Sequence, residues 1–109
     1  MTAVMATAAL ATTGYAHITK NPRVCGGKAC IDGTRIRVMD IVCLEREGKK
    51  PQEILHVFAT PLTLAQVHAA LAYYYDHPSE IEASFAEEDD VEAEIDRDRA
   101  EYLARPAGR

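Results

Sequence analysis

The alternation of hydrophobic and polar residues predicts a short β region near the start of the chain. Residues 15–38 are rich in turn-forming pairs, and Asp32-Gly33 separates two short strand-like segments, 29–31 and 34–38. An Asp-Gly pair in this setting predicts a β-hairpin closed by a type I′ turn, which requires positive φ at both central residues. A lone hairpin is marginally stable in water, so its apolar face must pack on helices or on a second copy.

From Met39 the hydrophobic period changes from two to about 3.6 residues, which predicts three helices. The first ends at Gly48, the second begins at Pro51 and ends at Pro61, and the third follows an N-cap at Thr63. The third is expected to end at Asp76-His77-Pro78. The residues expected to face the core are Val38, Ile41, Val42 and Leu44 in the first helix, Ile54, Leu55 and Phe58 in the second, and Leu64, Val67, Leu71 and Tyr74 in the third.

The link expected between the second and third helices is short, from Thr60 to Thr63. A link of this length is typical of a helix-turn-helix. It is equally typical of any tight helical hairpin. The pattern of hydrophobic residues leaves both arrangements open.

After Pro78 the chain becomes strongly acidic, and Ser79 is expected to cap a fourth helix. Acidic residues four positions apart, such as Glu92 and Asp96, repel each other, so this helix should fray when alone. Its apolar residues form only a thin stripe, made of Ile81, Phe85, Val91, Ile95, Tyr102 and Leu103. Such a segment is typical of one that folds onto a partner, and equally of a solvated helix packed lightly on its own domain.

The composition is that of a soluble globular protein with room for one domain, but its charge is unevenly distributed. The whole chain has a net charge of −5. Residues 15–79 carry eight Lys/Arg against six Asp/Glu, net +2, whereas residues 80–109 carry four against eleven, net −7. A basic body and an acidic tail point to two partners of opposite charge. A chain of this size buries only about 60–68% of its surface on folding, so a homodimer is also expected.

The cysteines and the first residues indicate where the protein works. Three cysteines cannot all pair within one chain, which favours a reducing cytosol, and without a CxxC pair buried or half-exposed thiols are expected rather than a metal site. Residues 1–14 are small and apolar but lack the basic start of a signal peptide, so we predict a flexible leader. No segment approaches the length of a membrane span. We therefore expect a cytoplasmic protein without membrane contact.

Enzymatic activity is not expected, and neither is a cofactor. Asp32, Asp40 and Asp76 could be imagined as metal ligands, but a turn, a helix start and a helix end use them. No nucleophile stands beside a base. Gly26-Gly27-Lys28 lacks the GxxxxGK[ST] spacing of a nucleotide-binding loop.

Three stretches of the chain together resemble a known family. They are Cys25–Val38, which reads GGK-x-x-I-x-GTRI-x-V from Gly26, then Gly48 with the Pro51–Leu55 segment, and then Leu62–His77. This pattern resembles uncharacterised-domain family 433 (DUF433) over about residues 15–82, although many members have Pro where this chain has Ala29. The leader and the tail beyond about Ile81 are not covered by the resemblance.

The resemblance implies a mainly α fold, a homeodomain-like (winged-helix-like) helix-turn-helix bundle with a short N-terminal β-hairpin, followed here by an acidic C-terminal helix. We expect a flexible leader over 1–14, a domain over 15–79 and an acidic helical tail over 80–109. Family members resemble VapB-type antitoxins, encoded beside a toxin with a PIN-like nuclease fold. The resemblance therefore implies an antitoxin of a type II toxin-antitoxin pair that neutralises a PIN-like ribonuclease and binds operator DNA for autoregulation.

These expectations assign residues to two surfaces. The residues expected to contact DNA are Lys28, Arg35, Arg37, Lys49, Lys50, Thr63, Gln66 and His68. The residues expected to bind the toxin are Phe85, Val91, Ile95, Tyr102 and Leu103. The third helix contains no Lys or Arg, which favours the alternative of a dimeric protein-interaction module that does not bind DNA. His68 is equally explained as a histidine at the edge of the core, and the three tyrosines from Tyr73 as packing residues.

Overall fold

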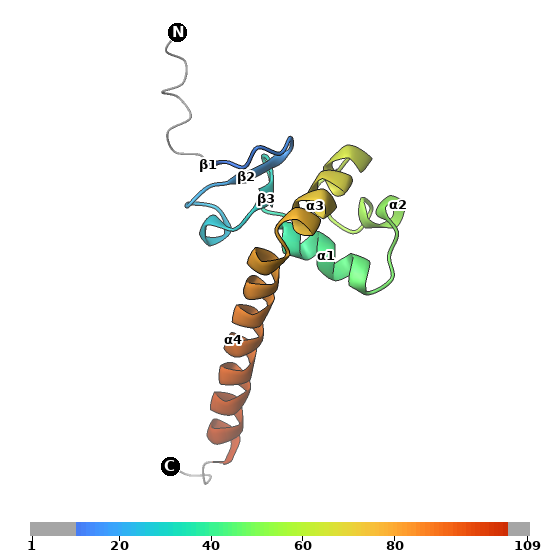
Figure 1. Ribbon diagram of the computed structural model, residues 1–109. Helices are drawn as coiled ribbons and strands as arrows, with labels where there is room; N and C mark the ends of the chain where they lie inside the picture. Colours follow the sequence, from blue (N-terminus) through green and yellow to red (C-terminus); the bar gives the residue numbers. More distant parts are fainter. Residues whose placement is uncertain (1–10, 105–109) are drawn as a thin grey trace.

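The computed structural model describes residues 11–104 of the 109-residue chain, and for Ala11 and Thr12 the backbone alone. A short antiparallel sheet lies at the N-terminal end and helices follow it (Figure 1). The helices are α1 (Val38–Arg46), α2 (Pro51–Ile54), α3 (Leu64–Asp76) and α4 (Pro78–Ala104), and a single 3-10 turn, η2 (Cys25–Gly27), precedes the last strand. The protein is therefore mainly helical, as the sequence predicts.

The sheet has three short antiparallel strands in the order β1 (Ala11–Thr12), β2 (Ile18–Lys20) and β3 (Cys30–Ile31). Ile18 is opposite Ile31, and both are buried against the helices. Residues 1–10 of the predicted leader lie outside the described residues. At the end of that predicted leader, Ala11 and Thr12 pair with β2.

The predicted pairing of segments 29–31 and 34–38 is confirmed, because the Ile31 N–H donates to the Ile36 carbonyl and the Val38 N–H donates to the Ala29 carbonyl, both at 2.9 Å. The chain does turn at Asp32-Gly33, where the Thr34 N–H donates to the Ile31 carbonyl at 3.0 Å. Of the two central residues only Gly33 has a positive φ, 76°, so the turn is not type I′. The predicted second strand is wrong, since Arg37 is already the N-cap of α1 and an isolated antiparallel bridge between Cys30 and Arg37 stands where a longer ladder was expected.

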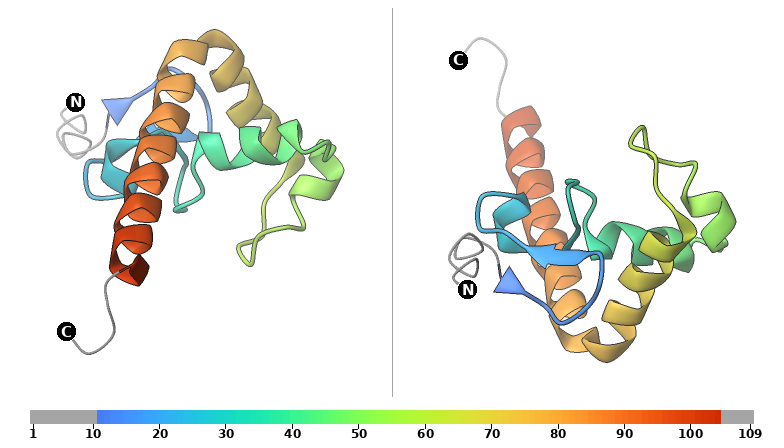
Figure 2. Two further views of the ribbon diagram at one scale, coloured as in Figure 1. Left: turned by 90° about the horizontal axis from the view of Figure 1, so that it is seen from below. Right: turned by 90° about the horizontal axis from the view of Figure 1, so that it is seen from above.

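The helices α1 and α3 form the centre of the core, and the sheet and α2 lie at opposite ends of it (Figures 1 and 2). The start and end of α1 agree with the sequence, and Gly48 has the left-handed φ of 94° that suits a residue just past a helix. On α3 the buried residues include Ala70 and Tyr73, whereas Leu64, predicted to be buried, is 41% exposed.

The second helix is much shorter than predicted, because α2 ends at Ile54 rather than at Pro61. Beyond it the hydrogen bonds span three residues instead of four, as in the bond from the Val57 N–H to the Ile54 carbonyl at 3.0 Å. Residues 55–63 therefore connect α2 to α3. The short link expected for a helix-turn-helix is not present.

The longest element, α4, begins at Pro78 directly after the end of α3, so Ser79 is not its cap. At about 1.5 Å per residue its 27 residues extend roughly 40 Å. Ile81 is 3% exposed and belongs to the core. Figure 1 shows the rest of the helix leaving the body and projecting away from it.

The N-cap of α3 provides a test of the local folding signals. The Thr63 hydroxyl accepts from the Gln66 N–H at 3.2 Å, and the Gln66 side-chain oxygen accepts from the Thr63 N–H at 2.8 Å. We expect Thr63→Ala to lower the free energy of unfolding by about 1 kcal/mol, because the Gln66 N–H at the helix start loses its side-chain acceptor. Urea denaturation measures this free energy, with Thr60→Ala in the exposed loop as the control. Equal losses of unfolding free energy in the two variants would contradict the assignment of Thr63 as the N-cap.

Candidate functional site

The first part of α4 is fixed to the body by a row of ion pairs. The cations come from β2, the loop after η2, the start of α1 and the end of α1. The pairs are Glu80 with Lys20 at 3.0 Å, Glu82 with Arg46, Glu87 with Lys28 at 3.0 Å, and Glu88 with Arg37 at 2.8 Å. Ile81, Phe85 and Glu88 follow at four and three residues and share one helix face, so Glu88 lies on the face of α4 that contacts the body.

Phe85 belongs to this attachment, although it was predicted to bind a partner. It is half-buried and packs against the core, and the Arg46 guanidinium lies 4.6 Å from its ring centroid. The Phe85 ring is thus already covered within the chain. The exposed part of α4 begins beyond it.

The tyrosines at the end of α3 brace the same corner. The Tyr73 ring is buried, and its hydroxyl donates to Glu80 at 2.7 Å. Tyr74 donates to Glu82 at 2.6 Å, and this bond, with the charge of Arg46, lowers the pKa of Glu82. Tyr75 donates to Glu45 of α1. The prediction that these residues serve packing is confirmed for Tyr73.

Beyond Glu88 the helix is exposed and acidic. Between Asp89 and Leu103 the sequence has seven acidic and two basic residues, and none of the seven makes an ion pair with a residue that the structure describes. The large apolar side chains of this part are exposed: Val91 53%, Ile95 52%, Tyr102 68% and Leu103 71%. Val91, Ile95 and Tyr102 follow at four and seven residues and form one stripe. We call residues 89–104 the distal segment of α4.

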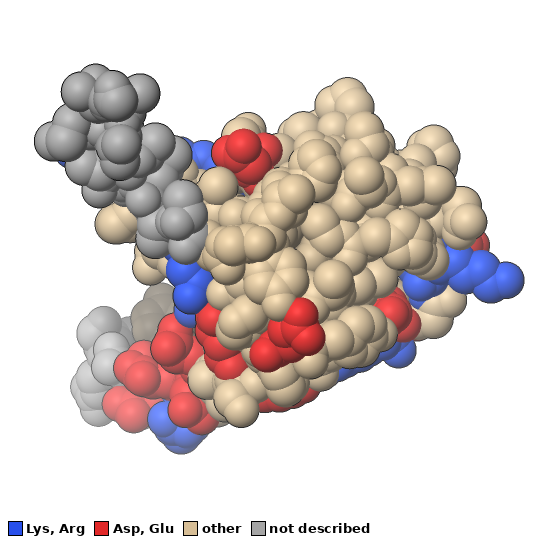
Figure 3. Space-filling view, turned by 45° about the horizontal axis from the view of Figure 1, so that its top comes forward, with Lys and Arg blue, Asp and Glu red and all other residues tan. Residues whose placement is uncertain are grey.

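Figure 3 shows the same separation on the surface. In the face drawn there, Asp and Glu side chains gather at the lower left, over α4. Most of the remaining surface of that face carries no charge. The acidic charge of the chain is thus concentrated on one element.

Two of the predicted DNA-binding residues are occupied by α4. Lys28 is paired with Glu87, and Arg37 is paired with Glu88 and also with Asp40 at 2.8 Å. Arg35 and Arg37 do not share a strand face as predicted, because Arg37 caps α1 and is half-buried whereas Arg35 is exposed.

The other predicted DNA-binding residues lie around α2 and the start of α3. Lys49 and Lys50 are exposed in the loop before α2. Thr63 and Gln66 cap α3 with each other, so their contact atoms are engaged in holding the helix. His68 is exposed on α3, and its placement at the core edge is therefore wrong.

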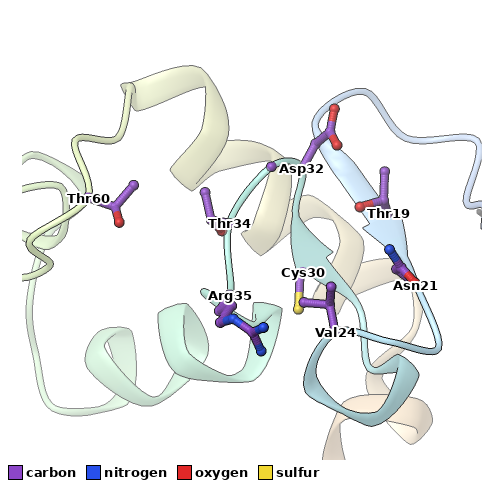
Figure 4. Close-up of a pocket in the computed structure, with 9 residues that line it drawn as sticks. Thr19, Asn21, Val24, Cys30, Asp32, Thr34, Arg35 and Thr60 are labelled. Atoms are coloured by element: carbon purple, nitrogen blue, oxygen red, sulfur yellow. The ribbon is translucent and has the colours of Figure 1, made fainter.

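A cleft of about 600 Å³ separates the sheet from the link between α2 and α3. Figure 4 shows Thr34 and Arg35 of the turn on one side, with Asn21 and Asp32 toward β2 and Thr60 across from them. Its lining mixes polar and apolar groups, and its two charged residues, Asp32 and Arg35, have opposite signs. The cleft thus has no net charge that would select an anion or a cation.

The three cysteines are free thiols in different environments, with Cys30 buried, Cys25 half-buried and Cys43 exposed. Burial, with a smaller contribution from its hydrogen bond with Cys25, raises the pKa of Cys30 to about 12. No group of three or more His, Cys, Asp or Glu side chains within residues 11–104 is arranged to hold a metal ion.

We expect iodoacetamide at pH 8 to modify Cys43 first and Cys30 at least roughly a hundredfold more slowly, because the thiolate is the reactive form. Mass spectrometry of the folded protein measures the order, and Cys43→Ser should remove the fast reaction. Fast modification of Cys30 in that variant would contradict its buried position.

Within the part of the chain that the structure describes, no helix is both long and apolar enough to cross a membrane.

Comparisons with known proteins agree with the fold. The family model described as "Protein of unknown function (DUF433)" matches residues 18–74. The chain is similar to a DUF433 member protein from Anabaena variabilis ATCC 29413, whose crystal structure superposes with a TM-score of 0.59 at 36% sequence identity. That similarity covers 64% of this chain and 68% of the other. No curated protein matches this sequence. With more than half of its residues within the family model, which spans β2, β3, α1, α2 and α3 as far as Tyr74, the chain belongs to the DUF433 family.

Proposed function

We propose that this chain is the antitoxin of a type II toxin-antitoxin pair and acts in the cytoplasm, where the distal segment of α4 binds and blocks a PIN-like ribonuclease. One observation carries the proposal. The distal segment projects from the body with Val91 and Ile95 about half exposed among acidic side chains that make no ion pair with a described residue. An exposed apolar stripe on a charged helix is typical of a segment that docks in a groove.

The charge of the distal segment suits a ribonuclease as partner. A groove that holds RNA is lined by Lys and Arg, so a helix with seven acidic and two basic residues between Asp89 and Leu103 is attracted to it. Once docked, Val91 and Ile95 supply the apolar anchors that such an interface needs at its centre. The acidic side chains then occupy the positions of substrate phosphates and exclude the RNA.

Operator binding is the second candidate activity. It is supported by the exposed cations Arg35, Lys49 and Lys50, which no carboxylate of the described chain neutralises. The alternative, a dimeric protein-interaction module without DNA binding, is favoured by α3, whose outward face carries no Lys or Arg and leaves Leu64 and Tyr75 exposed.

The proposal predicts that the apolar stripe, not charge alone, binds the ribonuclease. We expect Val91→Ser with Ile95→Ser to weaken binding about a hundredfold, because two buried anchors are lost while every charge remains. Ala93→Ser with Ala100→Ser, on the same exposed helix, is the matched control and should change affinity less than about twofold. Isothermal titration against the PIN-like protein encoded beside this chain measures both. Equal affinities for the two double variants would overturn the proposal.

A further inference from the structure

We infer that Lys28 and Arg37 form a binding site for nucleic-acid phosphates that Glu87 and Glu88 of α4 occupy in the free protein. The chain would then carry its own competitor for the phosphate backbone. This inference rests on the second candidate activity, operator binding, and adds to it a reason why two of the body's cations are covered by the acidic helix.

The fold brings the two cations together from separate segments. The Val38 N–H donates to the Ala29 carbonyl at 2.9 Å, and an isolated bridge pairs Cys30 with Arg37. The residue before Ala29 and the residue before Val38 therefore lie on neighbouring stretches of backbone. Both contribute a cation to the side of the body on which α4 lies.

The cations belong to the body, and the carboxylates are peripheral to it. The Lys28 and Arg37 side chains are 28% and 26% exposed, whereas those of Glu87 and Glu88 are 72% and 50% exposed. Asp40 holds the Arg37 guanidinium through Nε and Nη2 and leaves Nη1 to Glu88. The Arg37 guanidinium is thus held in place by the body, while the exposed glutamate side chains can swing into solvent at small cost.

The contacts are of a kind that phosphate can replace. Glu87 Oε1 accepts from Lys28 Nζ at 3.0 Å, and Glu88 Oε2 accepts from Arg37 Nη1 at 2.8 Å. Each glutamate uses a single oxygen, and a phosphate oxygen offers the same charge-assisted bond. Arg35, two residues before Arg37 and exposed, supplies a further cation beside the site.

The position of these carboxylates, not the acidity of α4, is what covers the site. Asp89 and Asp90 follow immediately on the same helix, are exposed, and make no ion pair with any described residue. A change of equal charge at the two neighbouring positions therefore separates a specific competitor from a general electrostatic effect.

The experiment compares Glu87→Gln with Glu88→Gln against Asp89→Asn with Asp90→Asn in the full chain. Binding of a short fluorescent duplex DNA of mixed sequence is followed by anisotropy across a salt series. We expect the first pair of substitutions to tighten DNA binding about three- to tenfold, because each exposed ion pair opposes the phosphate only modestly. The second pair should change DNA affinity less than about twofold. Adding Lys28→Gln to the first pair should remove the gain and flatten the salt dependence.

Each outcome has a distinct meaning. If both double variants gain DNA affinity equally, the covered site is refuted and operator binding stands. The same holds if neither variant gains affinity although the parent chain binds DNA. If no variant binds DNA even at low salt, both the covered site and operator binding are refuted. Circular dichroism of each variant shows whether α4 remains helical. If the gain in DNA affinity of the Glu87→Gln, Glu88→Gln variant persists after Lys28→Gln is added, the effect arises elsewhere and the inference is overturned.

Discussion

Removing residues 90–109 is expected to abolish binding of the ribonuclease and to leave the body folded. The deletion takes away Val91 and Ile95 with most of the unpaired acidic side chains, so an effect larger than that of the serine variants is expected, above about a thousandfold. Ile81, Phe85 and the four ion pairs with the body all precede the cut. Titration calorimetry measures the binding, and thermal denaturation measures the integrity of the body.

The position of the cut is decisive. Deleting from Glu80 onward would also remove Ile81 from the core and the Glu80 and Glu82 contacts, so a loss of binding could then be a loss of folding. A chain shortened to residue 89 that still binds the ribonuclease with unchanged affinity would contradict the role of the distal segment.

Ile81→Ala is expected to lower the free energy of unfolding by about 2–4 kcal/mol, because it leaves a cavity where α4 joins the core. Ile95→Ala makes the same chemical change on the same helix at a side chain that is 52% exposed. We expect it to change stability by less than about 0.5 kcal/mol. Chemical denaturation of the two variants measures the difference.

The two substitutions should have the opposite order of effect on ribonuclease binding. At a temperature where both variants are folded, Ile95→Ala should weaken ribonuclease binding and Ile81→Ala should leave it nearly unchanged. Comparable loss of stability in both variants would show that the distal segment packs on its own body, which contradicts its exposure.

Local signals predicted the parts of the fold that depend on neighbouring residues. Gly48 ends α1, Thr63 caps α3, and His77-Pro78 separates α3 from α4, because each effect acts within one helical turn. A helix after Pro78 was predicted as well, since it follows from helical spacing in a strongly acidic segment.

Contacts between distant residues explain what the sequence could not predict. β3 pairs with β2 as a strand, whereas its pairing with the segment after Asp32-Gly33 is limited to an isolated bridge, because that segment must begin α1. The second helix was overestimated because Phe58 reaches the core from a loop and its spacing still resembles a helix.

The same limit applies to the candidate surfaces. Nothing near Lys28 or Arg37 in the sequence shows that Glu87 and Glu88 cover them, since about fifty or more residues separate the partners. Phe85 was assigned to the partner for a related reason, because the stripe continues through it although the body already covers that part of α4.

The most direct test of the account is a titration of the PIN-like ribonuclease with the full-length chain while cleavage of a fluorescent RNA is followed. The account predicts that cleavage stops near an equimolar amount of the chain and continues unaffected in the presence of the chain shortened to residue 89. Undiminished cleavage in a large excess of the full-length chain would contradict the proposal that the distal segment of α4 neutralises the enzyme.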